Sequence, residues 1–272
     1  MGRSVDWELD FYYRPLVDAD NRKIWELLIH DRATGWRFER RCSPQEANAT
    51  WLRENLQIAL AEAPAPPQRV LYFRPLMSGI VERACKELDL QTRLTRRTFY
   101  LEEWLRARER DLYPSETGYQ PPGPPPAGLE RAPARPLPDA LRGERWAFVA
   151  LSATEIRELK ELEIPFGEQL NFALPPVPVP GVVIFSERAE PLAAWMSGVD
   201  PAWLYFQPGK PASLVLEAGI EERWVMVSFR NAQIIGEGED FEQAKERSAG
   251  HHFLVIQRPD QEEFTGFWSL HQ

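Results

Sequence analysis

Apolar and polar residues alternate at the start of the chain. Over residues 7–13 every second side chain is apolar, and Glu8 and Asp10 stand between the first three. A period of two is typical of a strand with one buried face. Residues 24–30 and 36–41 are predicted as the second and third strands, with turn-forming residues between the strands.

The first helix is predicted to begin at Ser43. The tetrapeptide Ser43-Pro44-Gln45-Glu46 combines a capping hydroxyl, a proline at the first helical position and a glutamate that can reach back to the cap. Leu52, Leu56 and Ala59 follow at helical spacing and would form the buried stripe. The other elements predicted for the first half are a strand at 69–73, a helix at 78–88, a strand at 90–95 and a helix at 100–110. The order βββαβαβα is that of ribonuclease-H-like folds, so we predict an α/β fold of this type with a mixed sheet.

The second half is also predicted to be α/β. A helix is expected to open at the capping box Ser152-Ala153-Thr154-Glu155, and another at Asp240-Phe241-Glu242-Gln243. The remaining predicted elements are strands at 146–151, 182–185, 203–206, 213–218, 223–229, 232–236 and 252–257 and a short helix at 191–197. Residues 213–257 then repeat the βββαβ order of the first half, which predicts that the second domain is a permuted relative of the first.

Proline divides the two halves. Nine prolines lie between Tyr113 and Arg145, and proline neither continues a helix nor donates to a sheet. We therefore predict a ribonuclease-H-like domain at residues 1–113, a proline-rich linker at 114–145 and a second α/β domain at 146–272.

The two halves differ in charge. Residues 1–110 hold 19 Lys/Arg against 17 Asp/Glu, a net +2, whereas residues 111–272 hold 13 against 24, a net −11. An acidic chain disfavours non-specific nucleic-acid binding, which depends on phosphate neutralisation.

The sequence also bears on the compartment. The chain has two cysteines, which favours a reducing compartment. No apolar run reaches the roughly 20 residues of a membrane span, and the first strand begins too early for a leader. We expect a cytoplasmic protein without stable membrane insertion.

Candidate catalytic and metal-binding groups are few. A metal-dependent nuclease would need clustered carboxylates, for which Asp10 and Glu46 are the available pair, while residues 72–74 offer no acid. The histidines 30, 251, 252 and 271 lack a metal-ligand spacing, and there is no Gly-x-Ser-x-Gly motif. We therefore expect no cofactor, no metal and no enzymatic activity, and a degenerate nuclease is the weakest hypothesis.

A local arginine cluster is the most informative chemistry. Arg93, Arg96 and Arg97 are followed by arginines at 106, 108 and 110, and guanidinium groups bind phosphate and stack on bases. In an extended segment Arg93 and Arg97 would share a face. Aromatic residues at 12, 13, 25, 36 and 72 belong to the same predicted sheet and could serve as stacking platforms. The alternative is a charged edge strand protected from pairing.

Several blocks of the chain resemble the Tab-two-like family of RNA-binding translation factors of chloroplasts and cyanobacteria. The resemblance begins with Trp7-Glu8-Leu9-Asp10-Phe11-Tyr12-Tyr13-Arg14-Pro15. The further blocks are residues 82–88, 96–98, 137–148, 180–186, 191–198, 253–255 and 266–268. Because the blocks follow one another in order over nearly the full length, the match is specific.

The resemblance implies a function without catalysis. It implies binding to A/U-rich messenger leaders and promotion of the synthesis of photosystem reaction-centre subunits, in a cyanobacterial-type cytoplasmic protein. Family members end on a Trp-Leu-Leu tripeptide tied to RNA binding, and residues 268–270 read Trp-Ser-Leu here.

The leading hypothesis is a non-enzymatic RNA-binding protein. Arg93, Arg96, Arg97 and Arg106 are expected to contact phosphate. Trp268, with Leu270 beside it, is expected either to stack on a base or to anchor the C-terminal strand. The alternative is a protein–protein adaptor, in which the acidic second domain and Trp195 and Met196 dock translation machinery or a nascent photosystem subunit without RNA contact.

Overall fold

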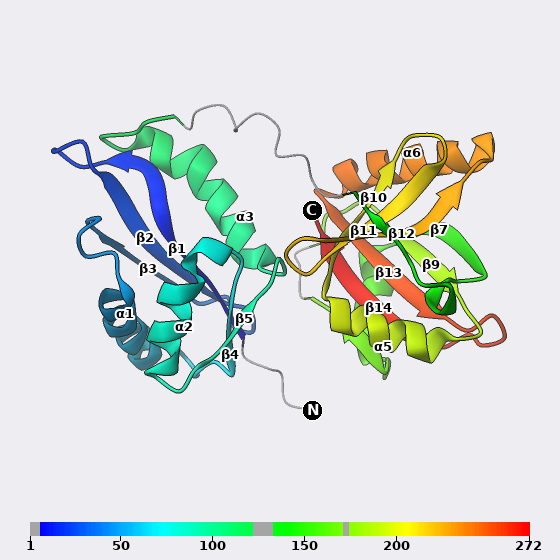
Figure 1. Cartoon of the computed structure of the whole chain (residues 1–272), viewed down its shortest axis with the longest axis horizontal. Helices are drawn as coiled ribbons and strands as arrows, with labels where there is room; N and C mark the ends of the chain where they lie inside the picture. The colour runs from blue at the N-terminus through cyan, green and yellow to red at the C-terminus, as the bar shows by residue number, and fades with distance from the viewer. Residues whose placement is uncertain (1–5, 122–132, 171–173) are drawn as a thin grey trace. The chain divides into compact units, whose positions relative to one another are not determined.

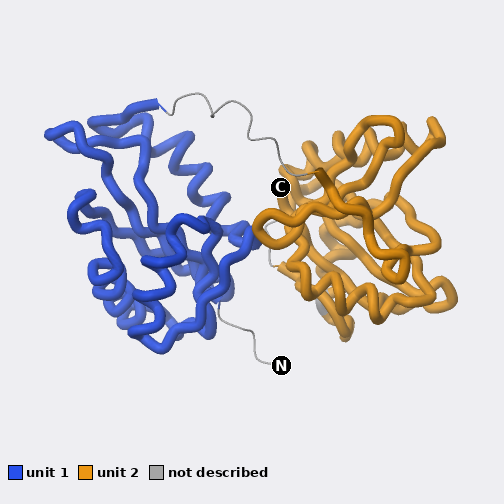
Figure 2. The backbone as a smooth tube through the Cα atoms, in the orientation of Figure 1, with its two compact units in different colours: residues 1–129 blue, residues 130–272 orange. Residues whose placement is uncertain are grey.

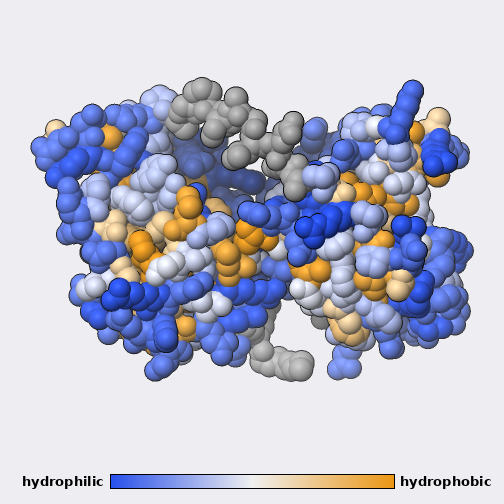
Figure 3. All heavy atoms as spheres, viewed as in Figure 1, coloured by the Kyte–Doolittle hydropathy of each residue, from blue (hydrophilic) through white to orange (hydrophobic). Residues whose placement is uncertain are grey.

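The computed structural model describes residues 6–121, 133–170 and 174–272. The chain forms two compact units, residues 1–129 and 130–272 (Figure 2). Both contain mixed β-sheets packed with helices, which confirms the predicted α/β class with two domains. Polar side chains cover most of the face seen in Figure 3, with apolar patches between them on both units.

Unit 1 is built around one five-stranded sheet in the order β3-β2-β1-β4-β5. β1, β2 and β3 are antiparallel neighbours, whereas β4 and β5 run parallel to β1. Its elements are β1 (Asp6–Val17), β2 (Lys23–Asp31), β3 (Arg37–Cys42), α1 (Ala49–Glu62), β4 (Arg69–Tyr72), η1 (Pro75–Met77), α2 (Ser78–Lys86), β5 (Gln91–Leu94), α3 (Phe99–Ala107), η2 (Arg108–Leu112) and η3 (Tyr113–Ser115). The predicted order βββαβαβα is confirmed, and the ribonuclease-H-like relationship stays a prediction.

Both faces of this sheet are covered. Trp7, Leu9 and Phe11 of β1 belong to the core under α1 and α2, as their alternation predicts. The polar residues between them are not exposed: Glu8 and Asp10 are 0% and 2% accessible, because α3 covers this second face (Figure 1). A carboxylate buried in this way has to be paired. The second face is therefore held partly by ion pairs.

Helix α1 begins five residues later than predicted. Asn48 is the N-cap, and its side chain accepts hydrogen bonds from the amides of Thr50 and Trp51, each at 3.0 Å. Ser43 and Glu46 do bond to each other, with the Ser43 amide 3.0 Å from the Glu46 carboxylate, but they close an isolated turn. The capping pattern is present, and the helix that follows it uses a different cap.

The end of unit 1 reaches beyond the last predicted helix. Tyr113 is fully buried against the second face, Glu116 pairs with Arg41 of β3, and Tyr119 forms a bridge with Leu16 of β1. Toward the other end of the proline-rich segment, Leu137 is buried in the core of unit 2. The segment predicted as a linker thus contributes contacts to each unit, and its residues 122–132 lie outside the described ones.

The described residues of unit 2 form two sheets. One has the order β10-β11-β12-β6 and the other β7-β9-β13-β14-β8. The elements are β6 (Arg135–Pro136), η4 (Asp139–Leu141), β7 (Arg145–Leu151), α4 (Ala153–Glu158), η5 (Leu159–Glu161), β8 (Phe166–Glu168), β9 (Val179–Phe185), α5 (Ala189–Val199), β10 (Pro201–Gln207), β11 (Ala212–Ala218), β12 (Glu222–Phe229), α6 (Ala232–Arg247), β13 (His251–Gln257) and β14 (Phe264–His271). Because its strands are divided between two sheets, their order is not a permutation of the single sheet of unit 1.

The main core of unit 2 lies between these sheets. Val182 and Leu254 of the five-stranded sheet belong to one hydrophobic cluster with Leu204 and Leu214 of the four-stranded sheet. Val183, next to Val182, belongs instead to a second cluster on the opposite face of its sheet. Strands β9 and β13 are therefore buried on both sides, which explains their unbroken apolar sequences.

The strand predicted at residues 232–236 is wrong, because these residues open helix α6. Asn231 caps the helix by accepting from the amide of Gln233 at 2.9 Å, and the predicted capping box at Asp240 lies inside it. Two glycines give this stretch the composition of a loop. At Gly238 a Cβ would stand 2.3 Å from the ring of Phe206, so this glycine allows the helix to approach β10.

Candidate nucleic-acid interface

An aromatic cluster lies toward the carboxyl ends of β1 and β4 in unit 1. The rings of Tyr12 and Tyr13 are 4.2 Å apart, and Trp25 meets both of them edge-on at 5.9 and 6.1 Å. The Arg74 guanidinium lies 4.2 Å from the ring centre of Tyr12 and 4.6 Å from that of Phe73. We refer to Tyr12, Tyr13, Phe73 and Arg74 as the tyrosine–arginine platform.

A buried carboxylate positions the cation of this platform. Asp10 accepts from Arg74 Nε at 2.7 Å and from Arg74 Nη2 at 3.2 Å, and its Oδ2 also accepts from Arg14 at 2.8 Å. Two guanidinium groups thus fix one carboxylate, and charge-assisted bonds of this kind are strong and directional. Arg74 keeps 28% of its side chain accessible, so one part of the group is anchored while another faces solvent.

The exposed ring of the platform is that of Tyr13, which is 44% accessible. A hydrogen bond with Tyr13 and burial raise the pKa of Tyr12, so its hydroxyl stays protonated at neutral pH. Uncharged rings beside a fixed guanidinium offer both stacking and cation–π contacts to a nucleobase.

The carboxylates considered for metal binding are used otherwise. Asp10 is held by arginines, and Glu46 accepts bonds from the Ser43 amide and hydroxyl. Within residues 6–121, 133–170 and 174–272, no group of three or more His, Cys, Asp or Glu side chains is arranged to hold a metal ion. In the same ranges no helix has both the length and the apolarity to cross a bilayer.

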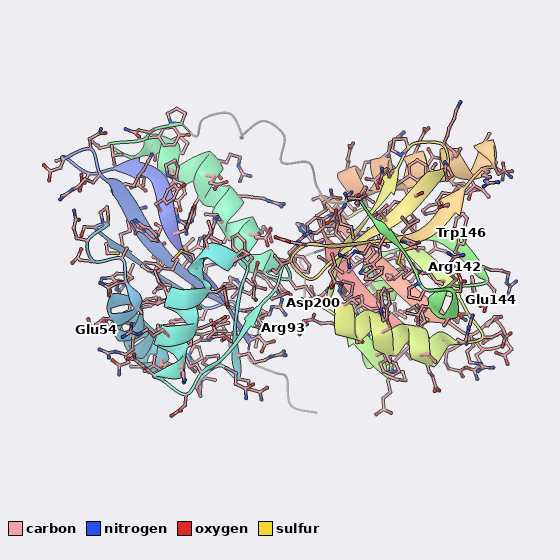
Figure 4. The ribbon with its side chains drawn as sticks, viewed as in Figure 1. Glu54, Arg93, Arg142, Glu144, Trp146 and Asp200 are labelled. Carbon is pink, nitrogen blue, oxygen red and sulfur yellow. The ribbon has the colours of Figure 1, made fainter. Side chains whose placement is uncertain are left out.

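Arg93 and Arg96 of the predicted arginine cluster lie on the edge strand β5 and the turn after it. Arg93 is half-buried on the edge strand β5, opposite Leu71 of β4 (Figure 4). The amide of Thr95 donates to the Tyr72 carbonyl at 2.8 Å, so the turn carrying Arg96 follows the point where Phe73 and Arg74 leave β4. The carboxyl ends of parallel strands are where α/β sheets place ligands.

Arg97 does not share the exposure of Arg93. It is 3% accessible, its amide donates to the Thr95 hydroxyl, and its guanidinium lies 5.3 Å from the ring centre of Phe99. Because β5 ends at Leu94, strand alternation no longer governs this position. Its burial removes Arg97 from direct reach of a phosphate.

Two arginines at the end of α3 differ in their exposure: Arg106 can reach a ligand, and Arg108 is buried. Arg106 is exposed, and it acts electrostatically on Glu102, as do Asp10 and Arg74. Burial raises the pKa of Glu102, while its hydrogen bond with Thr98 and the two arginines oppose this shift. Arg106 therefore lies on the platform side of the sheet. Arg108 is 7% accessible and pairs with Glu26 at 2.7 Å, which makes it part of the buried network.

The site residues predicted in unit 2 are largely internal. Trp268 and Leu270 of β14 are 2% and 0% accessible within the core between the sheets. Of the two roles considered for Trp268, anchoring the C-terminal strand agrees with this location. Met196 of α5 is fully buried. Trp195 is half-buried, with its ring 5.3 Å from that of Trp224.

Sequence reasoning does not select Phe73 and Arg74. In the sequence they stand out only as positions that lack an acid, although an Arg directly after a buried strand is itself a signal. Arg74 becomes informative once β4 is placed parallel to β1, because Tyr12 and Tyr13 then lie toward the same end of the sheet.

Comparison with known proteins gives a consistent family. The profile described as "RNA-binding protein Tab2/Atab2 N terminal" matches residues 6–108, and that of the "RNA-binding protein Tab2/Atab2, C-terminal domain" matches residues 124–271. A chloroplastic TAB2 homologue of Zea mays is 36% identical over 277 residues, covering 97% of this chain and 71% of the relative. Its counterpart from Arabidopsis thaliana is 32% identical, covering 97% of this chain and 74% of the relative.

Solved structures add little. The catalytic core domain of BIV integrase aligns with a TM-score of 0.31 and 14% identity, over 43% of this chain and 76% of the integrase domain. A simian T-cell lymphotropic virus intasome complex gives 0.27 and 10%, over 54% and 65% of the two chains. At these TM-scores neither alignment carries an argument. The two profiles and the two relatives, which match over 97% of this chain, do carry one, and the chain belongs to the Tab2/Atab2 family of RNA-binding proteins.

Proposed function

We propose that this protein binds single-stranded, A/U-rich RNA through unit 1 and has no enzymatic activity. Bases stack on the tyrosine–arginine platform, while Arg93, Arg96 and Arg106 hold the phosphates that run past it. The observation that carries the proposal is the Arg74 guanidinium, anchored by Asp10 and in contact with Tyr12 and Phe73. Flat rings beside cations are the usual means of holding single strands.

The charge distribution supports unit 1 over unit 2. The net charge of +2 over residues 1–110 permits approach of a polyanion, whereas −11 over residues 111–272 opposes it. Unit 1 also places arginines close to aromatic rings, toward the carboxyl ends of the parallel strands of one sheet. In the cell, RNA bound there is proposed to be the leader of messengers for photosystem reaction-centre subunits, with the protein promoting their translation.

The compartment is also a proposal. Cys42 and Cys85 are both free and buried, and burial raises the pKa of each thiol to about 12. Two free cysteines are consistent with a reducing environment, whereas the raised pKa makes the thiols unreactive. We propose the cytoplasm, whereas the two curated relatives are named as chloroplastic.

Filter binding with a short A/U-rich oligonucleotide tests the site. Tyr13→Ala is expected to weaken binding by about 1 to 3 kcal/mol, the range for one stacked base. Arg96→Ala and Arg106→Ala should each reduce the slope of log affinity against log salt by about 0.7 for every phosphate that is no longer neutralised.

Arg83→Ala is the matched control, because this arginine is exposed on α2, outside the platform and the turn that carries Arg96. If the Tyr13, Arg96 and Arg106 variants all bind like the control, RNA is not held at this edge. A G/C-rich oligonucleotide of equal length tests base preference, and translation of a reporter behind the A/U-rich leader tests the cellular role.

A further inference from the structure

A cavity of about 410 Å³ opens between the two sheets of unit 2. Val182 and Ile184 of β9 line one wall, and Leu214 of β11 with Val225 and Val227 of β12 line the other. This volume falls in the range of small-molecule sites, which are mostly apolar with a few polar groups at defined places. The proposed RNA interface of unit 1 contains none of these residues.

The rim of the cavity is a well-fixed loop between β6 and β7. The Glu144 amide donates to the Phe185 carbonyl at 3.0 Å, and the Glu144 carboxylate accepts from the Glu187 amide at 3.1 Å. A Cβ at Gly143 would stand 2.3 Å from Ile184 Cγ2, so glycine allows this loop to lie against β9. The loop belongs to the 137–148 block that resembles the family.

The polar groups of the cavity come from this loop and from the start of β7. Arg142 and Glu144 of the loop contribute a guanidinium and a carboxylate, and Trp146 of β7 contributes an indole ring (Figure 4). The indole is half-buried with its ring 4.4 Å from that of Phe229. The Arg142 side chain is 58% accessible and is paired at the surface with Asp139 at 3.2 Å.

The charge at the rim differs from that of unit 2 as a whole. The rim and the residues that contact it carry Arg142, Arg145 and Arg188 against Asp139, Glu144 and Glu187. Positive and negative charges are balanced here, within a half of the chain that holds 13 Lys/Arg against 24 Asp/Glu. An anionic group is therefore tolerated here, whereas the rest of the unit repels it.

We propose that this cavity binds one nucleoside monophosphate unit. The base enters beside Trp146, its exocyclic amino group donates to the Glu144 carboxylate, and its phosphate lies on Arg142. Indole rings stack on bases, carboxylates accept from base amino groups, and guanidinium matches phosphate. The choice of a nucleotide over another planar anion rests on the proposed function. The unit is either free nucleotide or one residue of a bound RNA.

Equilibrium dialysis of the full chain with labelled adenosine 5′-monophosphate tests this site. We expect one saturable site per chain. Arg142→Ala should weaken it roughly three- to tenfold, as expected for one charge-assisted contact at a partly exposed position. Val227→Trp fills the cavity and should abolish binding. Arg157→Ala, an exposed arginine of α4, and Tyr13→Ala in unit 1 should leave it unchanged.

Absence of saturable binding at millimolar nucleotide would overturn the proposal, as would full binding by both Arg142→Ala and Val227→Trp. Loss of binding in Tyr13→Ala alone would move the nucleotide to unit 1 and also overturn it. Filter binding then separates the sources: weaker RNA retention by Arg142→Ala identifies a base of the RNA, and unchanged retention identifies free nucleotide. If the wild-type chain retains no RNA but binds the monophosphate, the proposed function fails and the cavity proposal stands.

Discussion

At the scale of single residues, burial decides which of the chemically suitable side chains can reach a ligand. Trp268 packs in the core of unit 2, and a Cβ at Gly266 would stand 2.4 Å from its ring. Tyr13 has a smaller ring but leaves 44% of its surface accessible. The same contrast separates Arg97 from Arg106. By residue type, each of these two aromatic residues and two arginines could contact RNA. Only their accessibility shows that Tyr13 and Arg106 can reach a ligand.

The first prediction concerns Trp268. Trp268→Ala should lower the free energy of unfolding by about 3 to 5 kcal/mol, because it empties a large volume in a closed core. Trp268→Phe should cost less and leave the protein folded. Urea unfolding measures both changes. If Trp268→Phe weakened RNA binding at unchanged stability, the ring would be acting on RNA directly.

At the scale of elements, local hydrogen bonds set where helices begin. Asn48 and Asn231 cap α1 and α6, and each helix has a competing start signal nearby in the sequence, a serine or acidic residue before or inside it. The Ser43–Glu46 pair forms its bonds whether or not a helix follows. A capping motif therefore locates a turn, and the path of the chain decides whether a helix continues from it.

The second prediction compares Asn48 with Ser43. Asn48→Ala should reduce stability by about 1 kcal/mol, the usual cost of losing an N-cap. Ser43→Ala should cost less, because it breaks only an exposed turn. Thermal or urea unfolding of the pair checks this order, and a larger loss for Ser43→Ala would show that α1 depends on the earlier turn.

Much of unit 1 could be predicted from the sequence because its strands carry regular signals. The alternating Trp7, Leu9 and Phe11 and the stripe of Leu52, Leu56 and Ala59 correspond to surfaces that are buried in the structure. The start of α6 could not be predicted, since Gly238 is required by the ring of Phe206 from a distant strand. Tyr12 and Tyr13 could be predicted as stacking rings, but Phe73 and Arg74 could not be placed beside them, for the same reason. Arg74 gains its meaning from Asp10, 64 positions away in the chain.

At the scale of the whole molecule, buried ionisable groups link stability to pH. Burial lowers the pKa of His251 in unit 2 and, with Arg37 nearby, that of His30 in unit 1, each to about 4. The unfolded chain then binds more protons than the folded one between about pH 6.5 and 4, so stability is lost as the pH falls through this range. Unit 1 has an opposing group. Burial raises the pKa of Glu8 to about 7 despite the adjacent Arg32, which favours the folded state at lower pH.

The third prediction follows for His251. Between pH 6.5 and 4 this residue should remove up to about 1.4 kcal/mol of stability per pH unit. Urea unfolding of the wild type and of His251→Phe across this range measures the difference in slope. Equal slopes in the two proteins would mean that the ring titrates normally and contributes nothing to acid sensitivity.

The residues after α3 have a practical consequence for dividing this chain. Tyr113, Glu116 and Tyr119 lie beyond residue 108, where the N-terminal family match stops, yet they contact Glu26, Arg41 and Leu16. A fragment cut at that boundary would lack Tyr113, which donates to the buried carboxylate of Glu26 and packs against α3. An isolated first half should therefore be expressed through residue 121, so that it keeps the residues after α3 that pack against its own sheet.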